Sequence, residues 1–193
     1  MKTALLRSKR GEILKVKELW SEEKIQDRVL ELSTKIATYY KEKTEWKEGE
    51  KIVIVAILDG AIFFAVDLLR KLVSCFPLGT FEIETFGIES YRGEYPGKVR
   101  ITKDLKRPIE RKHVLIVEDI IDTGQTLDEL KKKFKIQKPK TLTFCVLIDK
   151  RSRRRKKVKV DFVGFVLEED WWLIGYGLDW KGLGRELPWI GRK

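Results

Sequence analysis

The side chains best suited to chemistry are concentrated in residues 118–126. Three carboxylates stand there, at Glu118, Asp119 and Asp122. They precede residues 123–126, a Thr-Gly-Gln-Thr turn before an expected helix, whose backbone N–H groups and hydroxyls suit a phosphate dianion. The carboxylates would repel that same anion, so they suit sugar hydroxyls, a divalent cation or a proton. Phosphate at one end and acceptors at the other describe a phosphorylated sugar as the ligand.

A simpler interpretation is that this segment is a solvated acidic turn that caps a helix. Acidic pairs at strand ends are common and by themselves indicate little. The combination of three carboxylates, a glycine turn and two threonines directly after a buried strand is far more specific. We therefore interpret residues 118–126 as a ligand site.

Alternating buried strands and amphipathic helices must position this site. Residues 114–117 form a continuous apolar run, which is typical of a strand covered on both faces of a parallel sheet. The strand–helix–strand order predicts an α/β fold, with a mainly parallel twisted sheet flanked by helices. Ligands bind at the carboxyl ends of such strands, where the acidic segment stands. The other expected strands are 52–58, 81–88, 141–148 and 161–166, and the expected helices are 22–40, 61–73 and 126–134.

The domain organisation follows from the length of 193 residues. Because one domain takes about 100–200 residues, we predict a single domain over residues 1–193. Its core is expected over about 45–167. Residues of about 1–20 and 168–193 fall outside the alternation and are expected to form a small hood over one end of the sheet.

Composition excludes several classes of protein. A hydrophobic share of 42% supports a packed core rather than disorder. The longest apolar run, residues 52–58, is far shorter than the roughly 20 residues of a membrane span, and no secretory signal is visible. Cys75 and Cys145 stand in apolar surroundings and predict buried, reduced thiols in a cytoplasmic protein. The single His113, at a strand start, is interpreted as structural.

Residues 114–126 resemble the phosphoribosyl pyrophosphate motif of type I phosphoribosyltransferases, and more narrowly that of the hypoxanthine-guanine phosphoribosyltransferases. The similarity covers most of the chain, through residues 20–26, 58–64, 89–91, 159–165, 175–179 and 185–191. It implies the fold of that family and the conversion of hypoxanthine or guanine plus 5-phosphoribosyl 1-pyrophosphate to IMP or GMP plus pyrophosphate. It also implies Mg²⁺ as cofactor, small-molecule substrates, and a homodimer or homotetramer.

The resemblance assigns roles within the motif. Glu118 and Asp119 would hold the ribose hydroxyls, and Asp122 would act as general acid/base at N7 of the purine. The remaining contacts to the phosphoribosyl donor would come from Ile120, Ile121, Thr123, Gly124, Gln125 and Thr126.

Further roles fall outside the motif. The pyrophosphate loop, which in this family often holds a non-proline cis peptide, would be residues 58–60. The residues implied for pyrophosphate are Asp59, Gly60 and Arg185, and the lid begins at Ser90 and Tyr91. Those implied for the purine are Lys159, Trp171, Trp172, Leu173 and Asp179. Those implied for Mg²⁺ are Asp179, Glu118 and Asp119. Lys159 would donate to the exocyclic O6, Leu173 would use its backbone, and Trp172 is favoured over Trp171 as the stacking ring.

One position departs from the family pattern. Asp59 stands where many relatives carry Lys, and a carboxylate beside pyrophosphate is unhelpful unless it points away. We therefore expect Gly60 and the loop backbone, rather than the Asp59 side chain, to bind the leaving group.

A basic run supports an alternative of another class. Residues 150–159 carry eight positive charges in a chain of net charge +11, and such runs can bind nucleic acid. The alternative is a nucleotide-sensing regulator that binds RNA or DNA on the same fold. No aromatic residue interrupts the run, so base stacking is not supported there, and we favour a solvated loop that attracts a polyanionic substrate. The complete acidic set at 118, 119 and 122 favours the enzyme. The preference among hypoxanthine, guanine and xanthine stays open.

Overall fold

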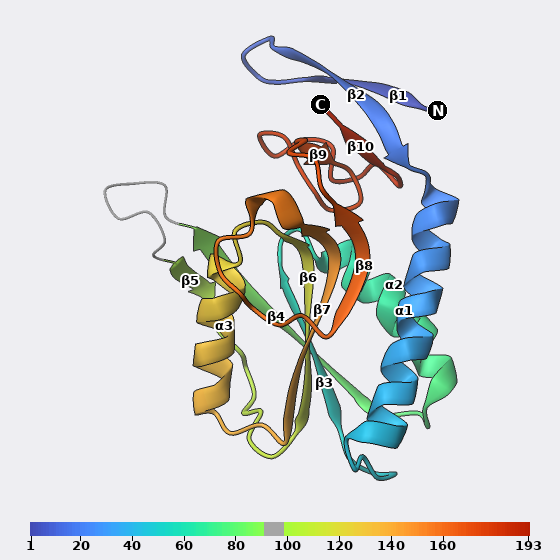
Figure 1. Cartoon of the computed structure of the whole chain (residues 1–193), viewed down its shortest axis with the longest axis vertical. Coiled ribbons are helices and arrows are strands. Elements are labelled where there is room, and N and C mark those ends of the chain that lie inside the picture. The colour runs from blue at the N-terminus through green and yellow to red at the C-terminus, as the bar shows by residue number, and fades with distance from the viewer. Residues whose placement is uncertain (91–98) are drawn as a thin grey trace.

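Two sheets organise the computed structural model, which describes residues 1–90 and 99–193 (Figure 1). Six strands form the larger sheet in the order β5-β4-β3-β6-β7-β8, and four form the smaller in the order β1-β2-β10-β9. The larger sheet contains β3 (Ile52–Leu58), β4 (Phe81–Ser90), β5 (Val99–Lys103), β6 (His113–Ile121), β7 (Thr141–Lys150) and β8 (Phe162–Leu167). The smaller contains β1 (Thr3–Arg7), β2 (Ile13–Trp20), β9 (Leu173–Ile174) and β10 (Ile190–Arg192).

The larger sheet is parallel except at one edge. Strands β4, β3, β6, β7 and β8 pair in parallel, whereas β5 runs antiparallel to β4. Every residue of β3 except its last is buried, as its β-branched run predicts for a strand covered on both faces. The predicted fold class is therefore confirmed, with β5 as a strand that the sequence did not indicate.

Helices cover both faces of this sheet. The helices are α1 (Glu22–Lys43), α2 (Ile62–Leu72) and α3 (Gln125–Ile136), with short 3₁₀ turns at Val73–Cys75 and Arg151–Arg153. Figure 1 shows α1 and α2 on one side of the sheet and α3 on the other. Side chains of β3 alternate accordingly: Ile52 and Ile54 pack in the α1–α2 cluster, and Val53 and Val55 pack in the α3 cluster.

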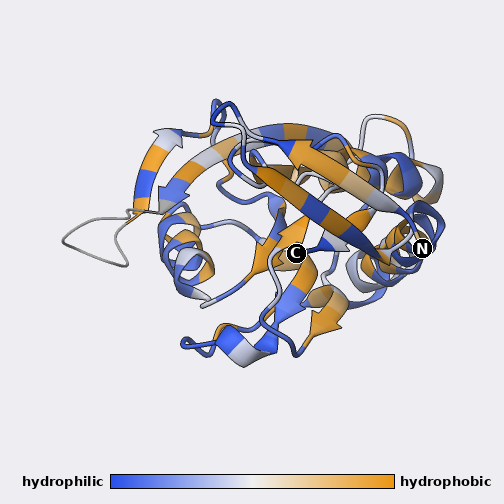
Figure 2. Cartoon of the chain, turned by 90° about the horizontal axis from the view of Figure 1, so that it is seen from above, coloured by the Kyte–Doolittle hydropathy of each residue, from blue (hydrophilic) through white to orange (hydrophobic). Residues whose placement is uncertain are grey.

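The smaller sheet forms the predicted hood above the larger one. It joins the β1–β2 hairpin to the two short strands near the other terminus, so both termini lie in the hood (Figure 1). Exposed and buried residues alternate along β2, and Figure 2 shows hydrophobic and hydrophilic bands along the hood strands. This alternation lets one face pack onto Trp189 and Ile174 while the other faces solvent.

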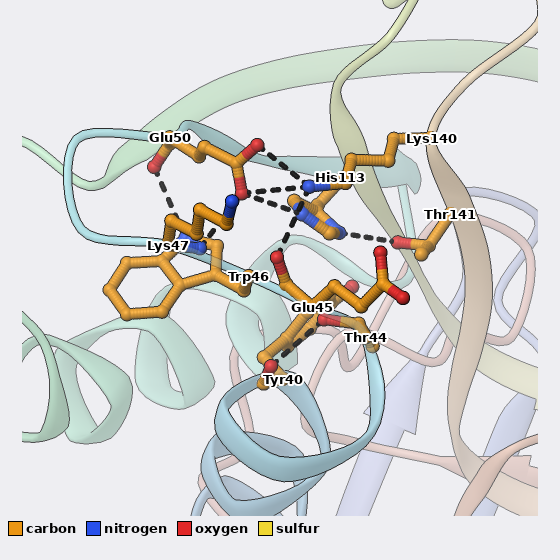
Figure 3. Close-up of polar contacts among 9 residues, drawn as sticks. All are labelled: Tyr40, Thr44, Glu45, Trp46, Lys47, Glu50, His113, Lys140 and Thr141. Carbon is orange, nitrogen blue, oxygen red and sulfur yellow. Dashed lines mark hydrogen bonds and ion pairs between the residues drawn. The ribbon is translucent and has the colours of Figure 1, made fainter.

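A polar network lies at the start of β6, at the end of the strand away from the hood, and Figure 3 shows its residues. The buried His113 ring lies 2.9 Å through Nδ1 from Oγ1 of Thr141, and 3.3 Å through Nε2 from Oε2 of Glu50. Glu50 also accepts hydrogen bonds from Nζ of Lys140 at 2.7 Å and from the backbone N–H of Lys47 at 2.8 Å. The predicted structural role of His113 is thus confirmed: it anchors the segment between α1 and β3.

The two cysteines differ in exposure. Both are free, but Cys145 is buried in β7 whereas Cys75 is only partly buried, so the prediction of two buried thiols was wrong for Cys75. It stands in the 3₁₀ turn after α2, at the surface rather than in the sheet. None of the helices in the described part of the chain has the length and apolar character needed to cross a membrane.

Candidate active site

The carboxylates of the acidic segment lie at the hood end of β6. The sequence predicts a strand over 114–117, but β6 continues to Ile121, so Glu118 and Asp119 stand within the strand rather than after it. Successive side chains of a strand point to opposite faces. Accordingly, Glu118 lines a cavity beside α3, and Asp119 lines a second cavity beneath the hood.

Burial makes these two neighbours weak acids. Desolvation, followed by the charge of Asp119, raises the pKa of Glu118 well above its ordinary value. Desolvation also raises the pKa of Asp119, although the backbone N–H of Ile120, at 2.7 Å, and the Arg185 charge oppose it. The pair therefore resists carrying two negative charges, and a bound cation or hydrogen-bond donors would relieve that cost.

The turn between β3 and α2 lies against Asp119. The Leu58–Asp59 peptide bond is cis, as the family resemblance implies. A Cβ atom placed on Gly60 would lie 1.6 Å from Oδ2 of Asp119, so only glycine lets this backbone approach so closely. The Asp59 side chain is 75% exposed, with Oδ2 4.0 Å from Nη2 of Arg185. Gly60 thus belongs to the site through its backbone, while the Asp59 carboxylate is directed outward.

The first cavity, called here the loop cavity, has a volume of about 290 Å³. Gly124 is the N-cap of α3, and its φ of 82° is the left-handed conformation that glycine tolerates. The carbonyl of Thr123 accepts hydrogen bonds from the backbone N–H groups of Arg155 and Lys156, both at 3.0 Å. The loop cavity is lined by Val99, Glu118, Ile120, Ile121, Asp122, Thr123, Gly124, Gln125, Thr126 and Leu127. A helix N-terminus and two hydroxyls therefore surround a space that suits a phosphate.

The second cavity, called here the hood cavity, has a volume of about 240 Å³. It lies between the acidic segment and the hood, and its walls combine aromatic and aliphatic side chains with charged ones. The hood cavity is lined by Asp119, Ile120, Asp122, Lys150, Trp171, Trp172, Leu173, Leu178, Asp179 and Arg185. The two cavities share Ile120 and Asp122. Asp122 therefore stands at their junction.

The two tryptophans of the hood cavity differ in what they contact. The Trp171 ring is covered by the Arg192 guanidinium, whose Cζ lies 3.9 Å from the ring centroid. Trp172 is 51% exposed, and its Nε1–H donates to the carbonyl of Asp179 at 3.0 Å. Of the two, Trp172 combines a fixed ring edge with a broadly exposed ring, and its stacking on a purine stays a prediction.

Asp179 and Arg185 form one unit at the cavity wall. Nη2 of Arg185 lies 2.9 Å from Oδ1 of Asp179, and Nη1 donates to the carbonyl of Gly177. Asp179 also accepts a hydrogen bond from the backbone N–H of Gly182 at 2.6 Å. Both predicted residues line the hood cavity, and they form an ion pair with each other.

The predicted base-binding lysine lies elsewhere. The Lys159 side chain is 80% exposed, with Nζ 3.1 Å from Oδ1 of Asp161, and it lines neither cavity. Lys150 lines the hood cavity instead. Its side chain is only 8% exposed, and its Nζ donates to Oδ1 of Asp170 at 2.8 Å and to the carbonyl of Trp171 at 3.0 Å.

The sequence offered one signal for Lys150. It is the last residue of β7, beside β6 in the parallel sheet, and the carboxyl ends of such strands share one edge. The basic residues that follow it obscured that signal. Of the predicted lid residues, Ser90 ends β4, and Tyr91 lies outside the described residues.

Residues 22–181 match the family described as "Phosphoribosyl transferase domain". This protein belongs to the phosphoribosyltransferase family. It is 41% identical to a hypoxanthine-guanine phosphoribosyltransferase of Aquifex aeolicus over 90% of this chain and 92% of that protein. It is 38% identical to a hypoxanthine-guanine-xanthine phosphoribosyltransferase of Tritrichomonas foetus, over 90% and 88% of the two chains.

A solved structure shows the same likeness. The hypoxanthine phosphoribosyltransferase of Trypanosoma cruzi in complex with the product IMP is 36% identical, with a TM-score of 0.82 over 91% of this chain and 92% of that one. The family relationship thus agrees with the parallel sheet and with the paired cavities.

In this phosphoribosyltransferase the basic run is largely neutralised within the fold. Five of its eight cations pair with acids, so the interpretation of the run as a purely solvated loop is incomplete. The five are Lys150, Arg151, Arg153, Arg154 and Lys159. These internal pairs reduce the charge available to a nucleic acid, and nothing in the structure or the comparisons favours the regulator alternative.

Proposed function

We propose that this protein is a purine-salvage transferase that joins hypoxanthine or guanine to 5-phosphoribosyl 1-pyrophosphate, giving IMP or GMP and pyrophosphate. The observation that carries the proposal is the position of Asp122, which borders both the loop cavity and the hood cavity. One cavity suits a phosphate and the other a planar base, so a nucleotide spanning both would place its glycosidic bond near Asp122. The activities named for the relatives support the same reaction.

The hood cavity is the proposed purine site. The exposed ring of Trp172 offers a stacking surface, and the backbone of Leu173 and the Asp179 region border the base. Lys150 is the proposed donor to the exocyclic O6. An ammonium has three N–H donors, and Asp170 and the Trp171 carbonyl take two of them, which leaves one for a ligand.

The loop cavity is the proposed site of the 5-phosphate. Residues 123–126 would bind it through the first N–H groups of α3 and the threonine hydroxyls, with Ile120 and Ile121 as apolar walls. Glu118 and Asp119 would accept the ribose hydroxyls, which donate hydrogen bonds without adding charge.

The pyrophosphate would lie against the β3–α2 turn. The Gly60 backbone borders Asp119, and Arg185 is the cation closest to this turn among the contacts described. Because the Asp59 carboxylate is exposed, it does not obstruct an anion bound to the backbone.

The proposed reaction forms one bond and breaks one. N9 of the base bonds to C1′ of the ribose as the C1′–O bond to pyrophosphate breaks, and the leaving group takes the bond's electron pair. The N7–H proton of the base passes to Asp122. Such positioned proton transfer contributes about 10²–10⁴-fold to a rate.

Magnesium is the proposed cofactor. In the described part of the chain, no group of three or more His, Cys, Asp or Glu side chains could hold a metal ion alone. Glu118 and Asp119 still fit Mg²⁺, because the ion prefers oxygen ligands and is held by one or two carboxylates together with substrate phosphates. Asp179 fits less well, since Arg185 and a backbone N–H already hold its carboxylate. When bound, Mg²⁺ would neutralise the charge of the pyrophosphate.

A spectrophotometric assay tests the proposal. Hypoxanthine, guanine and xanthine are each supplied with the phosphoribosyl donor, with and without Mg²⁺. We expect nucleotide formation from hypoxanthine or guanine, abolished by chelation with EDTA and restored by added Mg²⁺. No turnover with any of the three bases would refute the transferase.

Assembly and location are proposed from the surface. The α2 helix exposes Ile62, Phe63 and Val66, each more than 40% exposed, and these side chains suit burial against a second copy in a homodimer or homotetramer. Sedimentation should therefore give a mass of at least twice 22.7 kDa.

The two free thiols support a cytoplasmic location.

A further inference from the structure

Arg153 links the two sides of the candidate site. It stands in the 3₁₀ turn Arg151–Arg153, directly after β7. Its Nε lies 2.9 Å from Oδ1 of Asp122, and its Nη1 lies 3.2 Å from both carboxylate oxygens of Asp170. Asp170 in turn accepts a hydrogen bond from Lys150. One chain of contacts with alternating charge, Asp122–Arg153–Asp170–Lys150, therefore joins two residues that line the hood cavity, Asp122 and Lys150.

The two oxygens of Asp122 are in different environments. Oδ1 is buried, and it accepts no hydrogen bond from the described residues, so its contact with Arg153 is an ion pair only. The Asp122 side chain as a whole is 42% exposed. Because Oδ1 contributes almost nothing to that exposure, Oδ2 is the open oxygen. Arg153 thus covers the buried oxygen of a carboxylate that lines both cavities.

A surface ion pair would be a weaker explanation of this contact. Both side chains are about two-fifths exposed, and pairs of that kind contribute roughly 0–1 kcal/mol to stability. Stability alone would not require one arginine to bridge the loop before α3 to a residue beside the hood. A role in orienting Asp122 would require such a bridge. The Asp122 carboxylate follows the end of β6 and can rotate about two side-chain bonds unless another residue holds it.

We propose that Arg153 is a positioning residue that holds Asp122 with Oδ2 directed at N7 of the bound purine. The inference rests on the proposed function. Removing the guanidinium leaves the carboxylate free to rotate away from the purine. Loss of a partly exposed contact of about 1 kcal/mol corresponds to a roughly five-fold fall in kcat.

The test compares two arginines of the same loop. Arg153→Gln removes the bridge, and Arg153→Lys keeps the charge. Arg155→Gln is the matched control, because the Arg155 side chain is exposed and its contact with Thr123 is made by the backbone N–H. For each variant, kcat and the KM for hypoxanthine are measured, together with the Kd for IMP from tryptophan fluorescence and the melting midpoint.

We expect Arg153→Gln to lower kcat about five-fold while the Kd for IMP changes less than two-fold. Arg153→Lys should recover part of that loss in kcat. Arg155→Gln should match the wild type. In an Asp122→Asn background, Arg153→Gln should cause no further loss, because coupled residues are not additive.

Specific results would overturn the inference. Unchanged or increased kcat in Arg153→Gln, a lowered melting midpoint that accounts for the loss, or a full five-fold loss in the Asp122→Asn background would each do so while leaving the transferase intact. A wild type without turnover would instead refute the proposed function, and the inference with it.

Discussion

The acidic side chains near the two ends of β6 have pKa values shifted in opposite directions. At the end away from the hood, Glu50 is surrounded by donors, and hydrogen bonds from Lys140 and the Lys47 backbone lower its pKa to about 2 (Figure 3). At the hood end, burial raises the pKa of Glu118 and Asp119, and among the described residues Arg185 acts on Asp119 alone. The charge of Glu50 is therefore balanced in the free protein, whereas we propose that a ligand balances the charge of Glu118 and Asp119.

This difference separates stability from function along one sheet. The network around Glu50 and His113 should matter for folding and leave turnover unchanged. The acids at the hood end should matter for turnover and lower the stability of the free protein. The following predictions test that separation, from the largest expected effect to the smallest.

Asp122→Asn should cause the largest change. The amide keeps the shape of the side chain but does not accept the N7 proton, so kcat should fall about 10²–10⁴-fold. Binding of IMP, followed by tryptophan fluorescence, should change little. Unchanged turnover would refute the role proposed for Asp122.

Lys150→Met should raise the KM for the purine. Loss of a charged donor from a largely buried position corresponds to about 1.5–3 kcal/mol, or roughly 10- to 150-fold. Lys159→Met tests the residue that the family resemblance implies, and it should change the KM little because that side chain is 80% exposed and outside the cavity. The reverse order of effects in steady-state kinetics would restore Lys159 as the purine ligand.

Glu118→Gln should stabilise the free protein at neutral and higher pH. Because the folded-state pKa of Glu118 is raised, folded protein binds more protons than unfolded protein above the ordinary pKa, so wild-type stability falls as pH rises through that window. We expect the variant to be more stable than the wild type at pH 8, and the gain to vanish near pH 4.

Urea unfolding between pH 4 and pH 8 measures this gain. Glu110→Gln is the control, since that side chain is exposed. A Glu118→Gln variant less stable than the wild type at pH 8 would show that the buried acid stabilises the fold. That result would contradict the claim that the acids at the hood end lower the stability of the free protein.

Glu50→Gln should change the free energy of unfolding with the opposite sign. Its folded-state pKa of about 2 lies below the ordinary value of 4.5, so its contribution is present above about pH 4.5 and is lost as pH falls toward 2. The side chain is 35% exposed, and solvent screening limits the loss in the variant to about 1 kcal/mol at pH 7.

Thermal or urea unfolding of Glu50→Gln, with Glu48→Gln as an exposed control, measures this loss, and kcat should stay at the wild-type value. A large fall in kcat would show that the far end of β6 is coupled to the site.

The sequence predicts the features that are local. The apolar run of β3 and the helix-spaced side chains of α1 predict the layers, and the acidic segment predicts one wall of both cavities because its residues are contiguous. The turn chemistry of residues 123–126 likewise predicts the helix N-terminus beside them.

Features that depend on distant pairing were not predictable in this way. The sequence predicts that the two terminal segments form the hood, but not that β2 pairs with β10 across most of the chain. The choice between Lys150 and Lys159 depends on where β7 ends and on the course of the following loop. Nothing in the sequence distinguishes Arg153 from its basic neighbours, because only the fold brings Asp122 and Asp170 to it.

A crystal structure of the protein with IMP tests the central claim most directly. The account predicts the 5′-phosphate on residues 123–126, the purine between Trp172 and Lys150, and N7 within hydrogen-bond distance of Oδ2 of Asp122. A nucleotide bound with its phosphate outside the loop cavity, or with N7 turned away from Asp122, would contradict it.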